Sequence, residues 1–299
     1  MKTTVLYLFL FSIFLSSCTW TGHYGPGDDN QINLTDLLQS YDLWYVDFDR
    51  TEGRGNIDFM SKAFTLSFRP NYELFANNNM VGLGRTGGGY GIDMGYYRTD
   101  DINGILTIVD DLSGTFDFEV TQISYNEISL YNPERDVRYF LVGYTINNFD
   151  FDQLFYDNVT YFLQEYEAWR KFDDDIISPS SPFTNENFLS YYVEANTNVF
   201  NSSEDLPSTP LAQIYWDYSG VYEVRNTRYT QEKKLYLYYD INNNREEFLL
   251  TIIDDGHIKL QNLSSDNSYF FEGINYIQYK PNAKRIKHSK LVKSSYLKL

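Results

Sequence analysis

Phe116-Asp-Phe-Glu-Val120 alternates apolar and polar side chains, and Ile128-Ser-Leu-Tyr-Asn132 resumes the pattern after a short turn. Alternation with a period of two is typical of an antiparallel strand with one buried and one solvated face. Further runs lie near residues 43–49, 63–69, 72–76, 90–97 and 104–109, separated by turn-forming Asn, Asp, Gly and Pro residues. The pattern predicts a mainly β chain whose first half is a meander of about eight short strands, the spacing of an up-and-down barrel.

The second half of the chain repeats the end of the first half at an offset of 130 residues. Ile128-Ser-Leu-Tyr-Asn132 corresponds to Ile258-Lys-Leu-Gln-Asn262, and Gly143 corresponds to Gly273. Identical asparagines and glycines at one offset predict an internal duplication, because two unrelated meanders would share only alternating aromatics. The second half has about five recognisable strands after residue 220. We therefore expect two related antiparallel β-meander halves, lipocalin-like, each a full or a partial barrel.

A helical segment is expected to join the two halves. Its apolar residues recur at the spacing of an amphipathic helix, and they are Phe155, Val159, Phe162, Leu163, Tyr166 and Trp169. A second helix is expected after Thr184 as its N-cap. The resulting boundaries are a signal peptide over 1–17, a tether over 18–33, the first meander half over 34–149, the helical middle over 150–200, the second meander half over 205–280 and a tail over 281–299.

The amino terminus carries an export signal that ends at a cysteine. Lys2 supplies a positive charge, Val5–Leu15 is mostly apolar, and Leu15-Ser-Ser-Cys18 closes the segment. An apolar run of this length is too short to cross a bilayer of about 30 Å as a helix. The final tetrad resembles the bacterial lipobox, which implies cleavage before Cys18, diacylglycerol on its thiol and acylation of the new amino group, typically with palmitate. An ordinary secretory signal with a chance cysteine is the alternative.

Cys18 is the only cysteine of the chain, so no disulfide can stabilise the exported body. A hydrophobic core must do so, and the length is sufficient for one large domain or two of ordinary size. The resemblance to the lipobox implies a lipid anchor in the cell envelope, most simply in the outer membrane with the body facing the periplasm. Display on the cell surface is left open, because the acidic pair Asp28-Asp29 lies well downstream of the cysteine.

The net charge of −17 argues against nucleic acid as a partner, since phosphate contacts need a basic face. The exception is the carboxyl tail. No acidic residue follows Glu272, while seven cations gather near the end: Lys280, Lys284, Arg285, Lys287, Lys290, Lys293 and Lys298. The tail is expected to be a disordered end, or alternatively a basic foot that touches anionic lipid beside the anchor.

The meander resembles lipocalin-type barrels only weakly. That family opens with Gly-x-Trp on its first strand, whereas Asp42-Leu-Trp44 keeps the tryptophan alone and Gly220-Val-Tyr222 keeps the glycine alone. A closer resemblance is to a group of flavobacterial-type lipoproteins. The segments that carry it are Tyr41-Asp-Leu-Trp-Tyr-Val-Asp47, Phe64-Thr-Leu-Ser-Phe68, Asn147-Asn-Phe-Asp150, Tyr161-Phe-Leu-Gln-Glu-Tyr-Glu-Ala-Trp169 and Tyr276-Ile-Gln-Tyr279.

Members of that group sometimes carry the label nicotinate mononucleotide adenylyltransferase, which the residues here do not support. Such enzymes resemble one another in a His-x-x-His or His-x-Gly-His signature, whereas His23, His257 and His288 are far apart in sequence. Gly82-Leu-Gly-Arg-Thr-Gly87 has the letters of a dinucleotide fingerprint. The residues after it continue as a strand, and a phosphate loop needs a helix there. We expect a hairpin connection that binds no nucleotide.

Other catalytic and metal-binding patterns are equally weak. No Gly-x-Ser-x-Gly elbow occurs, and three scattered histidines do not make a zinc site. Paired acids sit at expected turns, where aspartate bonds the local backbone. Asp150, Asp152 and Asp157 would suit calcium, but a solvated helix start explains them better. We therefore expect no cofactor, no metal and no catalytic residue.

Twenty-eight tyrosines and twenty-two phenylalanines are the remaining lead to function. Most should fill the barrels, while exposed rings would stack on sugars or line a barrel mouth. Three functions stay open. The first is a non-catalytic module for a small apolar or glycan ligand, the second an assembly accessory that binds a protein partner, and the third an enzyme. A cavity inside the barrel would favour the first, an outer aromatic patch the second, and a cleft with converging carboxylates of perturbed acidity the third.

Overall fold

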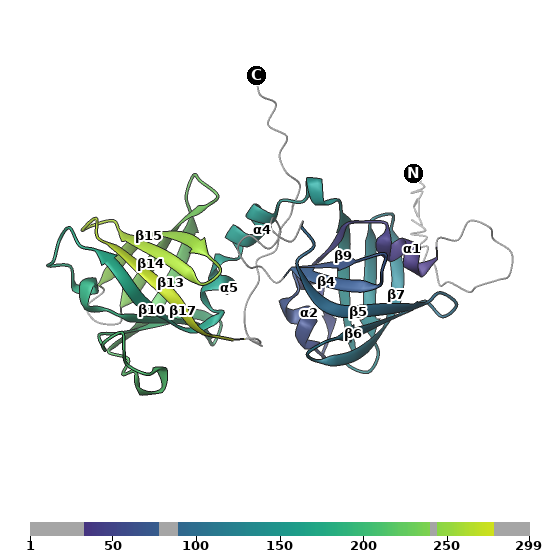
Figure 1. Ribbon diagram of the computed structural model, residues 1–299, viewed down its shortest axis with the longest axis horizontal. Coiled ribbons are helices and arrows are strands. Elements are labelled where there is room, and N and C mark those ends of the chain that lie inside the picture. The colour runs from purple at the N-terminus through teal and green to yellow at the C-terminus, as the bar shows by residue number, and fades with distance from the viewer. Residues whose placement is uncertain (1–32, 78–88, 240–243, 278–299) are drawn as a thin grey trace, which may run out of the picture. The chain divides into compact units, whose positions relative to one another are not determined.

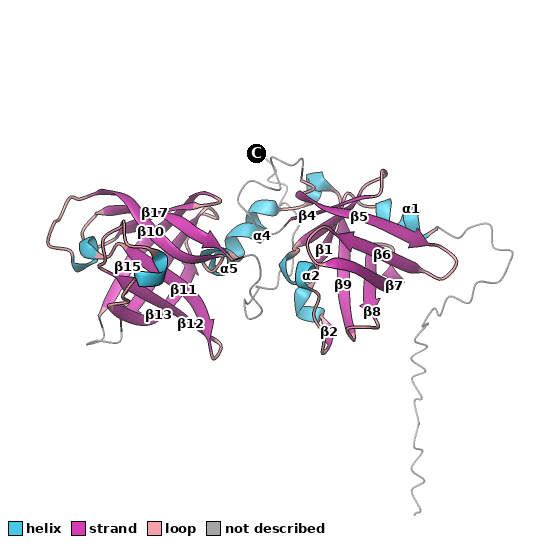
Figure 2. Ribbon diagram, turned by 60° about the horizontal axis from the view of Figure 1, so that its bottom comes forward, coloured by secondary structure: helices cyan, strands magenta, loops and turns pink. Residues whose placement is uncertain are grey.

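A computed structural model describes residues 33–77, 89–239 and 244–277. Cys18, the tether, the glycine run 82–87 and the basic tail lie outside these residues. The described chain forms two antiparallel barrels of eight strands each, which confirms the mainly β prediction (Figures 1 and 2). Each barrel is a meander in which neighbouring strands in sequence are neighbours in space.

The first barrel runs from Leu43 to Tyr144 and closes through pairing of its first and last strands. Its strands are β1 (Leu43–Val46), β3 (Thr65–Phe68), β4 (Glu73–Asn77), β5 (Ile92–Asp100), β6 (Ile105–Asp110), β7 (Gly114–Ser124), β8 (Glu127–Asn132) and β9 (Val137–Tyr144), and the short β2 (Glu52–Gly53) adds to β9. Its helical turns are α1 (Leu34–Gln39), η1 (Phe48–Arg50) and α2 (Asp58–Lys62).

The second barrel runs from Tyr166 to Tyr276. Its strands are β10 (Tyr166–Asp175), β11 (Phe188–Glu194), β12 (Thr197–Ser203), β13 (Tyr218–Asn226), β14 (Glu232–Tyr239), β15 (Arg245–Asp254), β16 (His257–Asn262) and β17 (Ser268–Tyr276), with turns η3 (Pro182–Asn185) and η4 (Leu211–Gln213). The connector before it holds η2 (Ile146–Asn148), α4 (Phe151–Asp157) and α5 (Val159–Leu163).

The boundaries at 150–200 and 205–280 are therefore wrong. The helical part ends at Leu163, and Tyr166 and Trp169 lie on β10 rather than on a helix. Their helical spacing is overridden because β10 pairs with β17 along its whole length, and this buries Trp169 completely. The helix expected after Thr184 is a single 3₁₀ turn followed by β11. The second half is a complete barrel of eight strands, not a shorter meander.

The internal duplication is confirmed by strand register. Glu119 pairs with Tyr131 on β7 and β8, and Leu249 pairs with Gln261 on β15 and β16, each shifted by 130. Both pairs of strands also carry a bulge at the same place, after Gln122 in the first barrel and after the corresponding Ile252 in the second. A bulge shared at one offset indicates common ancestry of the two barrels, since composition alone does not position bulges.

The repeat extends to the start of each barrel at an offset of 125. Trp44 and Trp169 are fully buried, and their indole nitrogens donate to Leu38 O and Leu163 O, each over 2.8 Å. These carbonyls belong to α1 and α5, the short helices that precede the two first strands. Each barrel is thus closed at this end by a helix that the tryptophan holds in place.

A glutamine at the carboxyl end of each helix, Gln39 in α1 and Gln164 directly after α5, makes the same contact in its barrel. Gln39 donates to the hydroxyl of Tyr97 over 2.7 Å, and Gln164 donates to the hydroxyl of Tyr222 over 2.6 Å. The amides and hydroxyls satisfy one another where water has been excluded, so burying them costs little.

The opposite end of each barrel is closed by the connection between its first two strands. In the first barrel this connection buries Phe59 and Met60, and Tyr139 accepts a hydrogen bond from the Ile57 amide. In the second barrel it buries Phe183, which lies 4.5 Å from Phe248 between ring centroids. Large buried side chains therefore occupy much of both interiors.

Candidate functional site

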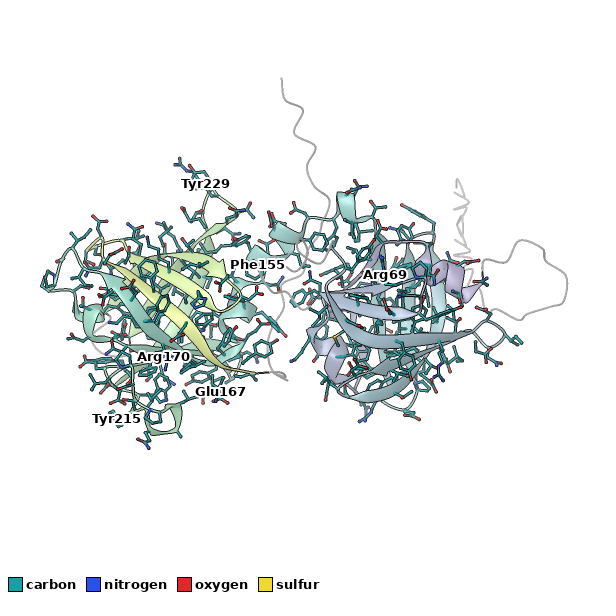
Figure 3. All side chains as sticks on the ribbon, in the orientation of Figure 1. Arg69, Phe155, Glu167, Arg170, Tyr215 and Tyr229 are labelled. Carbon is teal, nitrogen blue, oxygen red and sulfur yellow. The ribbon has the colours of Figure 1, made fainter. Side chains whose placement is uncertain are left out.

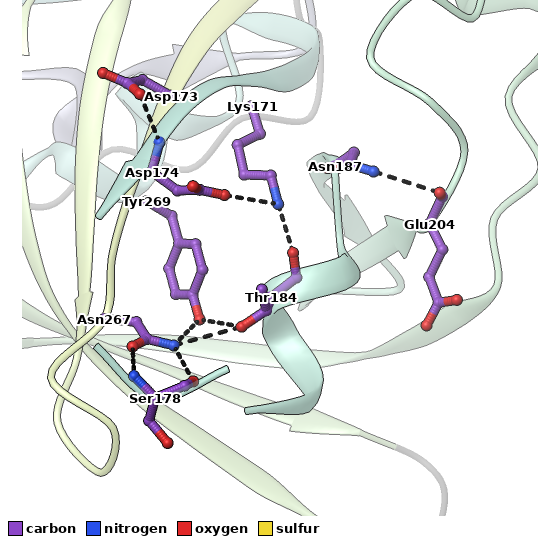
Figure 4. A network of polar contacts seen from close by, with 9 residues as sticks. All are labelled: Lys171, Asp173, Asp174, Ser178, Thr184, Asn187, Glu204, Asn267 and Tyr269. Carbon is purple, nitrogen blue, oxygen red and sulfur yellow. Dashed lines mark hydrogen bonds and ion pairs between the residues drawn. The ribbon is translucent and has the colours of Figure 1, made fainter. Parts of the chain in front are cut away.

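The loop that carries Phe183 is held on the second barrel by a buried asparagine (Figure 4). The carbonyl oxygen of the Asn267 side chain accepts from the amides of Ile177 and Ser178, both over 2.8 Å. Its amide donates to Ser178 O over 2.9 Å and to the Tyr269 hydroxyl over 3.0 Å. These bonds fix the segment 176–187, and with it the position of Glu186 at the barrel rim.

A pocket of about 360 Å³ opens at this rim. It is lined by two connections, β10–β11 and β14–β15, and by the ends of three strands. The lining residues are Pro182, Glu186, Tyr218, Tyr239, Asn244, Arg245 and Glu246. The up-and-down topology brings these segments together, because alternate connections of the meander all emerge at the same end of a barrel. We call this set of residues the Glu186 pocket.

Glu186 is the unusual residue of the pocket. Its side chain is only 4% exposed, and both carboxyl oxygens accept a hydrogen bond from the Tyr239 hydroxyl over 2.9 Å. Burial raises the pKa of Glu186 to about 8, and the negative charges of Glu246 and Glu204 act in the same direction. Burial and Glu186 also raise the pKa of Tyr239. A carboxyl kept largely neutral at pH 7 in an accessible pocket is a frequent mark of a functional site.

The cations near Glu186 form their ion pairs with other carboxylates. Lys171 is buried, and its ammonium donates to Thr184 O over 2.6 Å and lies 3.6 Å from a carboxyl oxygen of Asp174 (Figure 4). Arg245 lines the pocket but forms its ion pair with Glu247. Glu186 therefore has a tyrosine donor but forms no ion pair with a described residue.

A second surface lies on the first barrel around Tyr72. An open pocket of about 410 Å³ is lined there by Tyr72, Tyr96, Tyr97, Arg98 and Thr99. Tyr72 has a φ of +67°, a left-handed conformation that bulky side chains rarely adopt, and its ring is 49% exposed. Tyr97 packs against it with the ring centroids 5.5 Å apart. This Tyr72 shelf offers rings for stacking, but it lacks a buried polar group that would orient a ligand.

The residues singled out in the sequence do not gather at either surface. Asp150 caps α4 by accepting from the Gln153 amide, and Asp157 lies 3.8 Å from the Lys233 ammonium. The helix-start interpretation therefore holds for Asp150 and for Asp152 in the first turn, but it is wrong for Asp157, which is the last residue of α4. His257 pairs with Asp254 at 2.7 Å on an exposed turn. Within residues 33–77, 89–239 and 244–277, no three potential ligand side chains gather as a metal site would require.

Cys18, the expected lipidation site, and Gly82–Gly87 lie outside the described residues, as do His23, His288 and the tail cations. None of the helices in the described part of the chain is long and apolar enough to cross a membrane.

Glu186 and Tyr239 carried no signal in the sequence. They lie on segments 53 residues apart, and no spacing rule links a loop glutamate to a tyrosine at the end of a distant strand. Because the chain is rich in acidic residues, a single glutamate is not distinctive in its sequence.

Comparison of the chain with protein-family models and with curated proteins found no match. The geometry of the Glu186 pocket and of the Tyr72 shelf is therefore the basis for assigning a function.

Proposed function

We propose that this protein is a non-catalytic cell-envelope lipoprotein, anchored through Cys18, whose second barrel binds a small glycan in the Glu186 pocket. The pocket itself carries the proposal. It combines two tyrosine rings, Tyr218 and Tyr239, with a buried carboxyl and an amide from Asn244. Sugar recognition uses this combination, in which rings cover the apolar face of the sugar and polar groups bind its hydroxyls.

The packing of the barrels favours a glycan over an apolar ligand. An apolar ligand would need enclosed volume, and the interior positions are occupied by large buried side chains such as Trp44 and Trp169. The Glu186 pocket lies at the rim instead, where charged and amide side chains stand beside the two tyrosine rings. A ligand with many hydroxyls suits such a site.

The binding proposal is tested by nuclear magnetic resonance titration of the full chain carrying Cys18→Ser with glucose, galactose, glucosamine and N-acetylglucosamine. At least one sugar should shift signals of the pocket residues, and Tyr218→Ala should abolish the shifts. Tyr229→Ala is the matched control, because Tyr229 projects from the β13–β14 loop at the other end of the barrel (Figure 3). If no sugar of the panel shifts the pocket signals, or if the two variants behave alike, the proposal is wrong.

The anchor is tested by cell fractionation. Cys18→Ser should leave the protein exported but release it from the membrane fraction, because two or more acyl chains are what make such attachment stable. Equal membrane retention of the variant would contradict a lipid on Cys18.

A second candidate function follows from the same carboxyl. Glu186 shares its pocket with Glu246, and a carboxylic acid that stays protonated near neutral pH can serve as a general acid in glycoside hydrolysis. Nitrophenyl glycosides of the four sugars distinguish the two functions. Turnover that Glu186→Gln removes would establish a hydrolase, and binding without turnover would leave a binding module.

A further inference from the structure

Acidic residues predominate around Glu186, and a buried lysine that interacts with it electrostatically, Lys171, forms its ion pair with Asp174. Glu246 lines the same pocket, and Glu204 adds its negative charge to the surroundings of Glu186. Lys171 and Arg245 are engaged by Asp174 and Glu247, as described above. The pocket therefore offers a positively charged ligand a carboxyl that forms no ion pair with any side chain in the described part of the chain.

The aromatic walls favour the same kind of ligand. The rings of Tyr218 and Tyr239 lie 6.0 Å apart between centroids and meet at 80° in a T-shaped contact, and both line the pocket beside the carboxyl. Faces of tyrosine rings attract an ammonium group within about 6 Å. A carboxyl and aromatic rings that line one pocket are the elements that recognise an organic cation.

We infer that the Glu186 pocket binds the free ammonium group of an amino sugar, with that group against Glu186 and the sugar ring against Tyr218 and Tyr239. This inference rests on the proposed function and specifies its ligand class. It explains why the pocket keeps a buried carboxyl that costs folding free energy when it ionises. A neutral glutamine would bind sugar hydroxyls without that cost.

Binding of the cation should release a proton. Glu186 is largely protonated at pH 7, and the ammonium would pair with its ionised form, so up to one proton leaves for each sugar bound. The titratable groups around Glu186 come from every neighbouring strand: Lys171 on β10, Tyr191 on β11, Glu204 after β12, Tyr218 on β13, Tyr239 on β14 and Glu246 on β15. The proton is assigned to Glu186 because the tyrosine pKa values among these are raised, which keeps their hydroxyls protonated.

The experiment is calorimetry of the full chain carrying Cys18→Ser with glucosamine and with N-acetylglucosamine at pH 7. The two probes differ at the nitrogen, which is a charged ammonium in glucosamine and an uncharged acetylated amide in N-acetylglucosamine. Glucosamine should bind about ten-fold more tightly or better. Its binding heat should change with the ionisation enthalpy of the buffer, which reports the released proton. Glu186→Gln should remove both the preference and the buffer dependence, and Glu194→Gln, an exposed change, should keep both.

The outcomes separate this inference from the proposed function. If N-acetylglucosamine binds as tightly as glucosamine and Tyr218→Ala abolishes both, the pocket is a sugar site but the cation inference is wrong. A preference for glucosamine that survives Glu186→Gln also overturns the inference. Absence of binding by both probes counts against the glycan proposal as well as against the inference. Circular dichroism checks that the Glu186→Gln chain is still folded.

Discussion

The ring of Tyr166 lies so close to Gly273 that a methyl group on that glycine would come within 2.5 Å of the ring. The hydroxyl of Tyr166 continues past the strand and donates to Asp255 O over 2.8 Å. Tyr41 makes the same contact with Gly143 in the first barrel, where the added methyl group would lie 2.4 Å from the ring. The glycine that repeats in the sequence thus contacts a tyrosine that also repeats. Both residues lie where the first and last strands of the barrel meet.

Gly273→Ala is expected to destabilise the second barrel by about 1–3 kcal/mol, because the new methyl group must displace the Tyr166 ring. Urea denaturation measures this change. Gly256→Ala is the control, since its added methyl group would meet no atom nearer than 3.6 Å. Similar losses for the two variants would show that the close contact with Tyr166 is not what requires glycine at residue 273.

Phe183→Ala should cost about 3–5 kcal/mol, the range for removal of a fully buried phenylalanine. Phe183 packs against Phe248 and Tyr269, so its loss leaves a cavity between the loop and the barrel. Phe172→Ala is the matched control, because Phe172 is 52% exposed on the neighbouring β10. Denaturation should separate the two variants clearly, and a loss below about 1 kcal/mol for Phe183→Ala would argue against a plugged barrel.

Asn267→Ala should loosen the loop 176–187 more than it unfolds the barrel. The change leaves the amides of Ile177 and Ser178 without their acceptor, which costs about 1–3 kcal/mol where such groups stay buried. Hydrogen exchange should become faster in this loop, while β14 and β15 keep their protection. Ser180→Ala, an exposed change in the same loop, should leave the exchange rates unaltered. Unchanged exchange in Asn267→Ala would contradict the anchoring role.

The contribution of Glu186 to the free energy of unfolding should fall as pH rises between about 5 and 8. Its pKa is about 8 in the folded chain, against a value of 4.5 for a free glutamate side chain. In this window the folded state binds more protons than the unfolded state, so the free energy of unfolding decreases by up to about 1.4 kcal/mol per pH unit. Below the window both states are protonated, and above pH 8 both are ionised.

Glu186→Gln should remove this slope, and the comparison is made by denaturation of both proteins at pH 5, 6, 7 and 8. Because other groups titrate as well, the informative quantity is the difference in unfolding free energy between the two proteins. It should move in favour of the glutamine variant as pH rises. Glu194→Gln should show no such trend, since Glu194 is exposed. A pH-independent difference for Glu186→Gln would contradict the raised pKa.

The sequence alone predicted the β class, the buried faces of the strands from β7 to β9 and the duplication. Residues that alternate between core and solvent repeat with a period of two, and a shift of one residue would expose every buried side chain of a strand. The pairs Asn132 with Asn262 and Gly143 with Gly273 were therefore sufficient to align β7–β9 with β15–β17, and the structure has that register.

The secondary structure of residues 164–203 and the location of the pocket follow only from the tertiary structure. Tyr166 and Trp169 satisfy the spacing of a helix, and only pairing with β17 and contact with Gly273 make that segment a strand. The Glu186 pocket likewise joins side chains from two connections and three strand ends. Local periodicity records which face of a strand is buried. It carries no information on which distant side chains meet at a barrel rim, because closure and the packing of loops set those contacts.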